Sequence, residues 1–390
     1  MDNIKITTLT PTRIGSGEVY QQNFEFVKSL ENDDKLVLIN QEKVLDVIGF
    51  ENVHHWTSAI ENGEALTAYL HTRNKALKSN DIAARFIQIQ NENNPTRKPI
   101  KDVLAQLMSG NSPLLPGSSL KGSIRTALLN FYVMNDGDWF YENRKNLLSR
   151  RGRFDDGMIM KKHFGNDPNH EITRLLRVGD SRFETETVCS QARSVNLKND
   201  WGMDGDLDQY IEYIPPERTT SCRISFNEFL DKQAKKVTLK RRVFGRERKV
   251  EHYKLYSKYN TDDLRLPNLF DIINQHTAIL LDDELKFWEN QRRIPDEIDN
   301  YCEIMNDLLT QVDQLIEEEA KNTCILRVGW GTGFLNMTGG WQEKKLTNQD
   351  YENLLKEIRP RISQRTMMPK TRRMLYDGTP LGFVKLTLQN

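Results

Sequence analysis

Two glycine-rich segments, one in each half of the 390-residue chain, constrain its fold more than any other feature. Leu115–Ser119 precedes a run in which apolar residues recur at helical spacing. Gly329–Gly340 follows Cys324–Val328, an apolar run typical of a strand. Both halves therefore share one order of strand, glycine loop, helix and terminal strand. This order predicts an α+β fold in two modules, residues 1–225 and 226–390.

Further elements are predicted from periodicity and from the position of Gly and Pro. Loops or insertions are expected over the polar stretch Met134–Asp167. Helices are predicted at Asp46–Leu70, from Leu120 onward, and at Asn348–Ile358. Short strands are predicted at Ile4–Leu9, Phe24–Val27, Leu36–Ile39, Leu175–Val178, Arg223–Phe226 and Leu381–Leu388.

Charge is balanced in total but unevenly distributed. Lysine plus arginine and aspartate plus glutamate both number 55. Residues 235–254 carry nine basic residues against Glu247 and Glu251, whereas residues 282–319 carry thirteen acidic residues against three basic ones. The basic segment is interpreted as a solvated face, with an exposed hairpin as an alternative. The acidic region contains a helical apolar stripe, so we expect a helix with one packed face. A neutral total does not exclude nucleic-acid binding, because distribution matters more than the sum.

Several classes of protein are disfavoured. The four cysteines, Cys189, Cys222, Cys302 and Cys324, lack the spacing of a zinc site. The N-terminus lacks the apolar core of a signal peptide, and no apolar stretch is long enough to cross a bilayer. We therefore expect a cytoplasmic protein without a metal, a cofactor or a membrane partner.

The first glycine-rich segment has the chemistry of a phosphate site. Gly117 would allow close approach of a ligand, and free amides at a helix start attract anions. Ser118 or Ser119 is a natural N-cap, and Lys121 and Arg125 lie one turn apart on one face. The order of lysine and glycine differs from a Walker A loop. A capped helix with solvated charges is the equally weighted alternative.

The second segment is interpreted as a broad loop lying against a polyanion. Trp330 and Phe334 are candidates for stacking on bases. A dinucleotide fingerprint is disfavoured, because Leu335–Gly340 is a poor helix start and too little chain follows for another βαβ unit. The alternative interpretation, a tight structural turn with its aromatic residues in the core, stays open.

A third basic cluster lies near the C-terminus. Arg359–Arg365 and Lys370–Arg373 interleave basic residues with serine, threonine or glutamine. Such side chains are typical of phosphate contacts.

An ordered set of motifs resembles the RAMP superfamily of CRISPR proteins, and within it the fifth-subunit family of type III-A Csm interference complexes. The landmarks span nearly the whole chain and are Thr10–Gly17, Leu115–Thr126, Leu326–Phe334, Pro369–Arg373 and Pro380–Leu386. The resemblance implies two ferredoxin-like (RRM-like) RAMP domains.

The resemblance also implies a non-catalytic role in antiviral defence. Such a subunit would cap the 3′ end of the guide RNA and assist guide maturation by recruiting host nucleases. Its partners would be the guide (CRISPR) RNA, the backbone RAMP subunit and the small helical subunit. With the basic clusters, it predicts these RNA-contacting residues: Arg13, Gly117, Ser118, Ser119, Lys121, Arg125, Gly329, Trp330, Gly331, Thr332, Gly333, Lys370, Arg372 and Arg373.

Catalysis finds little support in the sequence. A metal-independent endoribonuclease that processes repeat RNA is the main alternative, and it needs groups that transfer protons. His54 and His55 form the sole histidine pair, beside Trp56 in a predicted helix, where packing or exposure is the simpler interpretation. Asp33 and Asp34 lie in a polar turn. A nucleotide-dependent enzyme that uses Gly329–Gly333 is the third and weakest hypothesis.

Overall fold

The structure is a computed structural model that describes most of the chain. The described residues are 2–31, 34–62, 65–90, 99–147, 157–165, 171–196, 207–233, 237–243, 246–253, 260–291, 294–358 and 371–389. Side chains are described over the same ranges apart from positions 59, 144–147, 232–253 and 354–358.

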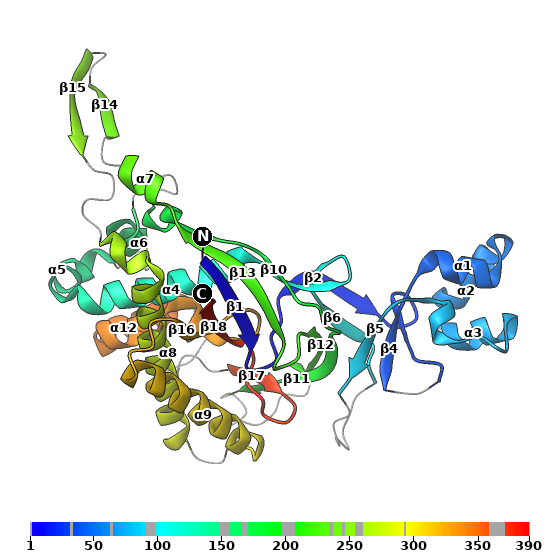
Figure 1. Ribbon diagram of the computed structural model, residues 1–390. Coiled ribbons are helices and arrows are strands. Elements are labelled where there is room, and N and C mark those ends of the chain that lie inside the picture. The colour runs from blue at the N-terminus through cyan, green and yellow to red at the C-terminus, as the bar shows by residue number, and fades with distance from the viewer. Residues whose placement is uncertain are drawn as a thin grey trace.

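A five-stranded antiparallel sheet forms the centre of the molecule and brings the two chain ends together (Figure 1). Strand β1 lies between β13 and β18, so the first and last strands are neighbours. The predicted strands near the termini are confirmed. The order across the sheet is β16 (Thr323–Arg327), β18 (Phe383–Gln389), β1 (Asp2–Thr8), β13 (Thr219–Phe226) and β9 (Leu176–Val178).

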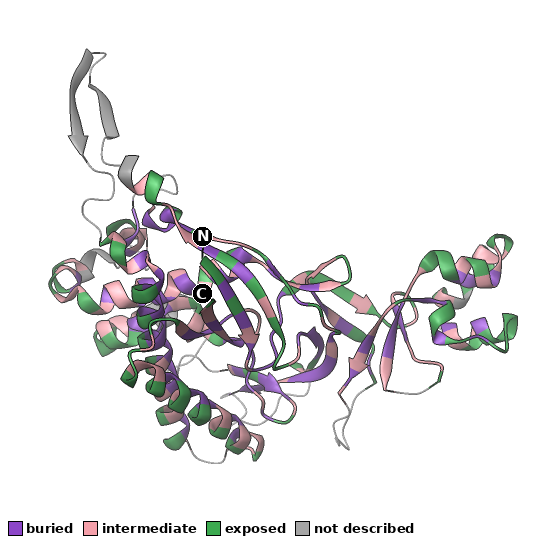
Figure 2. Ribbon diagram, in the orientation of Figure 1, coloured by how far each residue is buried: buried purple, intermediate pink, exposed green. Residues whose placement is uncertain are grey.

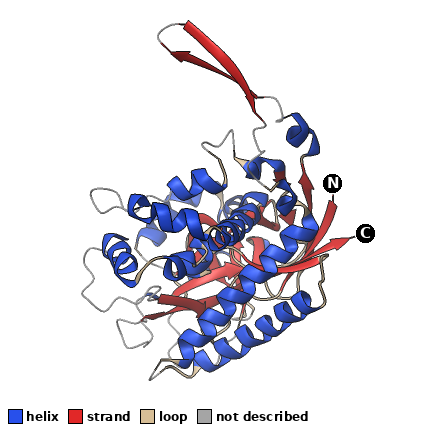
Figure 3. Cartoon of the chain, turned by 90° about the vertical axis from the view of Figure 1, so that its left-hand side faces the viewer, coloured by secondary structure: helices blue, strands red, loops and turns tan. Residues whose placement is uncertain are grey.

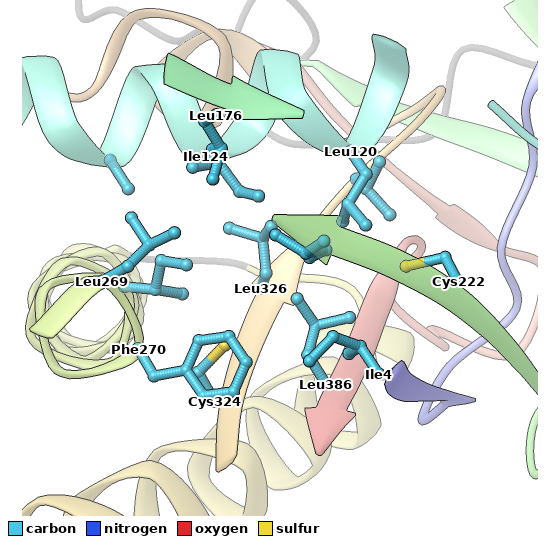
Figure 4. Close-up of a cluster of buried hydrophobic side chains, with 14 of the residues drawn as sticks. Ile4, Leu120, Ile124, Leu176, Cys222, Leu269, Phe270, Cys324, Leu326 and Leu386 are labelled. Atoms are coloured by element: carbon cyan, nitrogen blue, oxygen red, sulfur yellow. The ribbon is translucent and has the colours of Figure 1, made fainter. Parts of the chain in front are cut away.

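Two long helices cover one face of this sheet and form the main core. Helix α4 (Gly117–Asn135) contributes Leu120 and Ile124, and α8 (Leu266–Glu289) contributes Leu269 and Phe270. Figure 4 shows these side chains meeting those of the strands. Burying each such side chain contributes about 1.5–3 kcal/mol, so the sheet and its helices form one unit.

Helix α8 also covers the free edge of β16. The Asn274 side chain donates to the Thr323 carbonyl at 3.0 Å and accepts from the Ile325 amide at 3.0 Å. The Thr277 hydroxyl donates to the Ile325 carbonyl at 2.8 Å. These side chains satisfy backbone groups that an edge strand would otherwise leave unpaired.

A larger mixed sheet lies beside the first and carries β17. Strand β11 pairs with β5 in parallel and with β12 and β17 antiparallel. The order is β2 (Gly15–Gln21), β6 (Asp102–Gln106), β12 (Gln209–Tyr213), β11 (Val188–Asn196), β5 (Ala83–Ile89), β4 (Lys35–Ile39) and β3 (Phe26–Lys28), and β17 (Thr371–Leu375) pairs with β11 off this path.

A helical lobe projects between β4 and β5, at the opposite end from α5 (Figure 1). The predicted single helix Asp46–Leu70 is wrong in its continuity: the segment divides into α1 (Gln41–Ile48), α2 (Val53–Glu61) and α3 (Leu66–Arg73). Helix α1 ends at Gly49, whose φ of 80° leaves the helical region. The apolar residues Val44, Ile48, Leu66 and Leu70 of the lobe are buried against the sheet.

The expectation of loops over Met134–Asp167 is wrong for the described part. Helix α4 runs to Asn135, and α5 (Gly137–Leu147) and α6 (Gly157–His163) follow. Phe140 and Ile159 are buried in a cluster with Trp341, so apolar packing outweighs the polar composition. The few apolar residues of this segment were the only feature of its sequence that could have indicated packed helices.

For the basic segment the alternative of a hairpin is confirmed, and for the acidic region the helix with one packed face is confirmed. The basic segment forms an antiparallel hairpin, β14 (Val237–Val243) with β15 (Arg246–Tyr253), that projects from the body (Figure 1). The acidic region forms the end of α8 and α9 (Glu297–Glu317), whose stripe Tyr301, Met305, Leu308 and Val312 is buried. Apart from the α1–α3 lobe, the helices gather on one side of the sheets (Figure 3), and their outward faces are exposed (Figure 2).

The remaining elements are short apart from α12. They are η1 (Phe50–Asn52), η2 (Ser79–Asp81), β7 (Met108–Ser109), β8 (Ser112–Leu115), η3 (Ile172–Leu175), β10 (Ser181–Arg182), α7 (Glu228–Gln233), η7 (Thr261–Leu264), α10 (Gly333–Thr338), α11 (Trp341–Lys345) and α12 (Asn348–Ile358).

The α+β class is confirmed. Strands from both sides of the predicted module boundary share the five-stranded sheet, because β1 pairs with β18, which follows residue 225. The boundary itself stays a prediction. Within the described residues, no helix is both long and apolar enough to cross a membrane.

Candidate nucleic-acid interface

The first glycine-rich segment is occupied by the protein's own groups. The Gly117 amide donates to the Asp180 carboxylate at 2.7 Å, and the amides of Ser119 and Leu120 donate to the Pro116 carbonyl. The N-cap position belongs to Pro116, so the prediction of Ser118 or Ser119 as N-cap is wrong. Both serines lie in the first turn.

Close packing explains the glycine at the start of α4. A Cβ atom at Gly117 would lie 2.2 Å from the Val178 carbonyl oxygen. Glycine is therefore required for the approach of α4 to β9. A bound anion is not needed to explain the residue, since Asp180 already supplies a negative charge to this helix start.

Lys121 and Arg125 are also engaged within the protein. The Lys121 ammonium donates to the Leu176 carbonyl at 2.8 Å, which covers the free edge of β9. Arg125 donates to the Glu171 carboxylate at 2.7 Å. Burial lowers the pKa of Lys121. The alternative of solvated charges is thus also incomplete, because both cations have structural partners.

The second segment turns sharply and opens to solvent at its end. Gly329, Gly331 and Gly333 have φ angles of 93°, 85° and 84°. A Cβ atom at Gly329 would lie 2.4 Å from the Arg13 carbonyl oxygen, whereas one at Gly333 would meet nothing within 4 Å. Thr332 is buried and donates to the Gly329 carbonyl at 3.2 Å. The segment is therefore a fixed turn with an open tip at Gly333.

Helix α10 begins at Gly333, so the expectation of a poor helix start is wrong. It ends after six residues at Gly339, whose φ is 91°. In the part of the chain described after it, β17 and β18 pair antiparallel with their neighbours. A dinucleotide fingerprint requires a parallel βαβ unit, and this arrangement does not support one.

Trp330 brings two distant arginines together. The Arg13 guanidinium carbon lies 5.2 Å from the centre of the Trp330 ring, and that of Arg373 lies 4.6 Å from it. The Trp330 amide donates to the Arg13 carbonyl at 2.8 Å. Two guanidinium groups therefore contact this ring, which holds the two arginines close together; stacking of the ring on bases stays a prediction.

Arg13 is a buried cation whose charge is incompletely compensated. It is 3% exposed, its Nη2 donates to the Ala105 carbonyl at 3.1 Å, and its Nε has no hydrogen-bond partner. Burial lowers the pKa of Arg13 to about 10, Glu212 opposes this effect, and Arg373 adds to it. The group therefore stays protonated at neutral pH.

Glu212 is the carboxylate that raises the pKa of Arg13, but its hydrogen bonds are made to other groups. Glu212 is fully buried and accepts from the Arg85 guanidinium at 2.5 Å, the Thr187 hydroxyl at 2.5 Å and the Gln106 amide at 3.0 Å. A buried charge is costly unless it is paired. Arg373, in contrast, is exposed and can meet an anion from solvent, and guanidinium groups match phosphate geometry.

Arg372 lies in the core, directly beneath this surface. It is 6% exposed and forms two hydrogen bonds of 2.9 Å with the buried Glu284. Its charge is directed inward, so we assign Arg372 to the core and not to a surface. Lys370 and Arg359–Arg365 lie outside the described residues.

The predicted residues therefore separate into two groups. Arg13, Gly329–Gly333 and Arg373 come together, whereas Gly117–Arg125 form the packed start of α4. Sequence reasoning missed the acidic partners Asp180, Glu171 and Glu284. Their signal was weak, because single carboxylates far along the chain carry no recognisable spacing.

The histidine pair has no catalytic setting in the described structure. His54 and His55 are both exposed on α2, in the outer lobe. Among the described residues, no group of three or more histidine, cysteine, aspartate or glutamate side chains could hold a metal ion. Cys189, Cys222 and Cys324 are buried, as expected for incidental thiols.

An antiparallel sheet covered by two helices, with a glycine-rich turn following an edge strand, defines an α+β protein of the RAMP type. The family model described as "RAMP superfamily" matches residues 5–336, and the chain belongs to that superfamily.

Two solved structures share the fold. A chain of a Csm–crRNA–target RNA ternary complex from a type III-A CRISPR–Cas system, determined by cryo-EM, is 19% identical, with a TM-score of 0.73 and full coverage of both chains. The crystal structure of T. onnurineus Csm5 is 16% identical, with a TM-score of 0.62, covering 97% of this chain and 99% of that one. No curated protein sequence matches.

Proposed function

We propose that this chain is the fifth subunit of a type III-A Csm complex and binds the guide RNA without cutting it. The observation that carries the proposal is the pair of guanidinium groups at Trp330, one buried without full compensation and one exposed. An RNA phosphate would supply the missing negative charge. Similarity in fold to a chain of a Csm–crRNA–target RNA complex and to Csm5 supports the assignment.

The proposed partners are the guide RNA, the backbone RAMP subunit and the small helical subunit, in the cytoplasm. The finer role is to cap the 3′ end of the guide RNA, with host nucleases recruited for its maturation. We propose the Arg13–Trp330–Arg373 cluster as the main contact, with Gly331, Thr332 and Gly333 beside it. Lys370 is proposed as an adjoining contact from its sequence position alone.

Co-expression with the other Csm subunits and a CRISPR array tests this assignment. The purified complex should contain this chain, and the guide RNA should lose protection at its 3′ end when the chain is omitted. Absence of the chain from the complex, or loss of protection confined to the 5′ end, would contradict the proposal.

The non-catalytic role needs its own assay. The purified chain, incubated with repeat RNA without metal, should leave the RNA intact. Cleavage that disappears in His54→Ala or His55→Ala would instead establish the endoribonuclease.

A further inference from the structure

A buried ionic cluster lies directly beneath the Gly331–Asn336 segment. Glu284 of α8 accepts two hydrogen bonds of 2.9 Å from Arg372 of β17, one on each carboxylate oxygen. The indole of Trp288 donates to the same carboxylate at 2.9 Å, and the Tyr301 hydroxyl donates to it at 3.3 Å. Three elements, α8, α9 and β17, are therefore joined at one carboxylate.

The cluster is charged despite its burial. Burial alone would raise the pKa of Glu284, but the charge and hydrogen bonds of Arg372 outweigh it, and the pKa is lowered. Arg372 also lies 4.1 Å from the centre of the Phe287 ring and 5.7 Å from that of Trp288. A two-bonded guanidinium–carboxylate pair fixes orientation as well as distance. It therefore fixes how β17 faces α8.

The strand geometry transmits this orientation to the surface. Successive residues of a strand point to opposite sides. Arg372 points inward to Glu284, so its neighbour Arg373 is exposed and reaches Trp330. The ladder to β11 pairs Val195 with Arg372 and Ser194 with Arg373, which sets the register of the same two residues.

A small hollow lies beside the cluster. Its volume is about 30 Å³, and its lining includes Glu284, Tyr301, Arg327, Gly331 and Arg373. A single water needs at least about 10–15 Å³ measured in this way, so one or two waters would fill it. The polar groups of the cluster are paired with one another, which favours positioning as its role.

We propose that Glu284 is a positioning residue for RNA binding: by anchoring Arg372, it holds Arg373 against Trp330 in the geometry that meets an RNA phosphate. This inference rests on the proposed function. Glu284 itself does not contact the RNA, and its effect on binding is transmitted by β17.

The test measures the affinity of the purified chain for a fluorescent single-stranded RNA over a series of salt concentrations. Arg373→Ala should weaken binding about tenfold at low salt, as for one charge-assisted hydrogen bond. It should also reduce the slope of log affinity against log salt by about 0.7, the value for one phosphate contact on a single strand. Glu284→Gln should reproduce both changes.

The slope separates positioning from simple destabilisation. A variant that only unfolds part of the sample loses active protein at every salt concentration and keeps the slope. The double variant Glu284→Gln/Arg373→Ala should bind like Arg373→Ala alone, because the contact is already lost. Asp282→Asn removes the same charge from the exposed face of α8 and should change neither quantity.

Arg372→Lys is the second variant, for use if Glu284→Gln does not fold. It keeps the buried charge but cannot form two parallel hydrogen bonds, so it should also lower the slope. If Arg373→Ala lowers the slope but folded Glu284→Gln and Arg372→Lys keep it, the positioning role is wrong. If Arg373→Ala itself changes nothing, the proposed function fails first.

Discussion

The Arg373 guanidinium lies 4.6 Å from the centre of the Trp330 ring and thereby joins β17 to the turn that follows β16. Arg13, which follows β1, reaches the same ring from the other end of the chain at 5.2 Å. Three segments far apart in the sequence thus meet at one indole. Because the buried Arg13 has an unsatisfied Nε and Arg373 is exposed, we propose that the ring organises the phosphate contact.

Trp330→Leu should therefore weaken RNA binding although the change removes no charge. Each cation–π contact contributes about 0.5–2 kcal/mol, so loss of both should reduce affinity by about tenfold or more. Trp330→Phe, which keeps an aromatic face, should lose less. Fluorescence anisotropy with single-stranded RNA measures the effect. Phe50→Leu, at an 81%-exposed aromatic residue on the outer lobe, is the matched control and should bind normally.

Gly117→Ala should destabilise the fold by about 3 kcal/mol, near the upper end for overpacking, because the new Cβ would meet the Val178 carbonyl oxygen at 2.2 Å. Gly122→Ala, one turn further along α4, would meet nothing within 4 Å and should stabilise the helix by about 1 kcal/mol. Chemical denaturation of both variants measures the difference. Equal effects would show that the approach of α4 to β9 is not the constraint.

Thr277→Val should cost about 1–3 kcal/mol of unfolding free energy. The change removes the hydroxyl that donates to the Ile325 carbonyl at 2.8 Å and leaves this buried acceptor unsatisfied. Thr310→Val removes an exposed hydroxyl that bonds to its own helix and should have a much smaller effect. Denaturant midpoints of the two variants provide the comparison; similar losses would contradict the edge-covering role of Thr277.

His276 should make the protein less stable in mild acid. Burial, with a smaller effect from Lys344, lowers its pKa to about 4. Below pH 6.5 the unfolded chain therefore takes up a proton at this residue while the folded chain does not. The resulting loss should be about 2 kcal/mol between pH 7 and pH 5.

His276→Gln tests this origin of the acid sensitivity. Its unfolding free energy should fall less steeply between pH 7 and pH 5 than that of the unchanged protein. Some dependence should persist, because burial also lowers the pKa of His163 to about 4. An unchanged pH profile would exclude His276 as a source.

Local patterns predicted the elements well where periodicity and packing agree. The apolar stripe of α9 and the strand before Gly329 are examples, since both bury their apolar residues as the spacing indicates. Patterns were less informative for α5 and α6, where Phe140 and Ile159 pack in one buried cluster with Trp341 and stabilise helices in polar sequence. The local sequence of such a segment does not show which distant residues it packs against.

The candidate site was predictable in part for the same reason. Glycines at 329, 331 and 333 signal a special backbone, and their positive φ angles confirm it. Which cations are free depends on partners far along the chain: Lys121 is used by Leu176 and Arg372 by Glu284, whereas Arg373 stays exposed. Sequence places Arg372 and Arg373 side by side and cannot distinguish them without the pairing of β17.

Crosslinking of the guide RNA to this chain within the assembled complex tests directly whether RNA lies against the Trp330 turn and Arg373. After ultraviolet irradiation and digestion, we expect RNA-modified peptides from residues 329–336 and from the β17 region that contains Arg373. Crosslinks confined to the α1–α3 lobe or to the outer face of the five-stranded sheet, with none in these two segments, would contradict it.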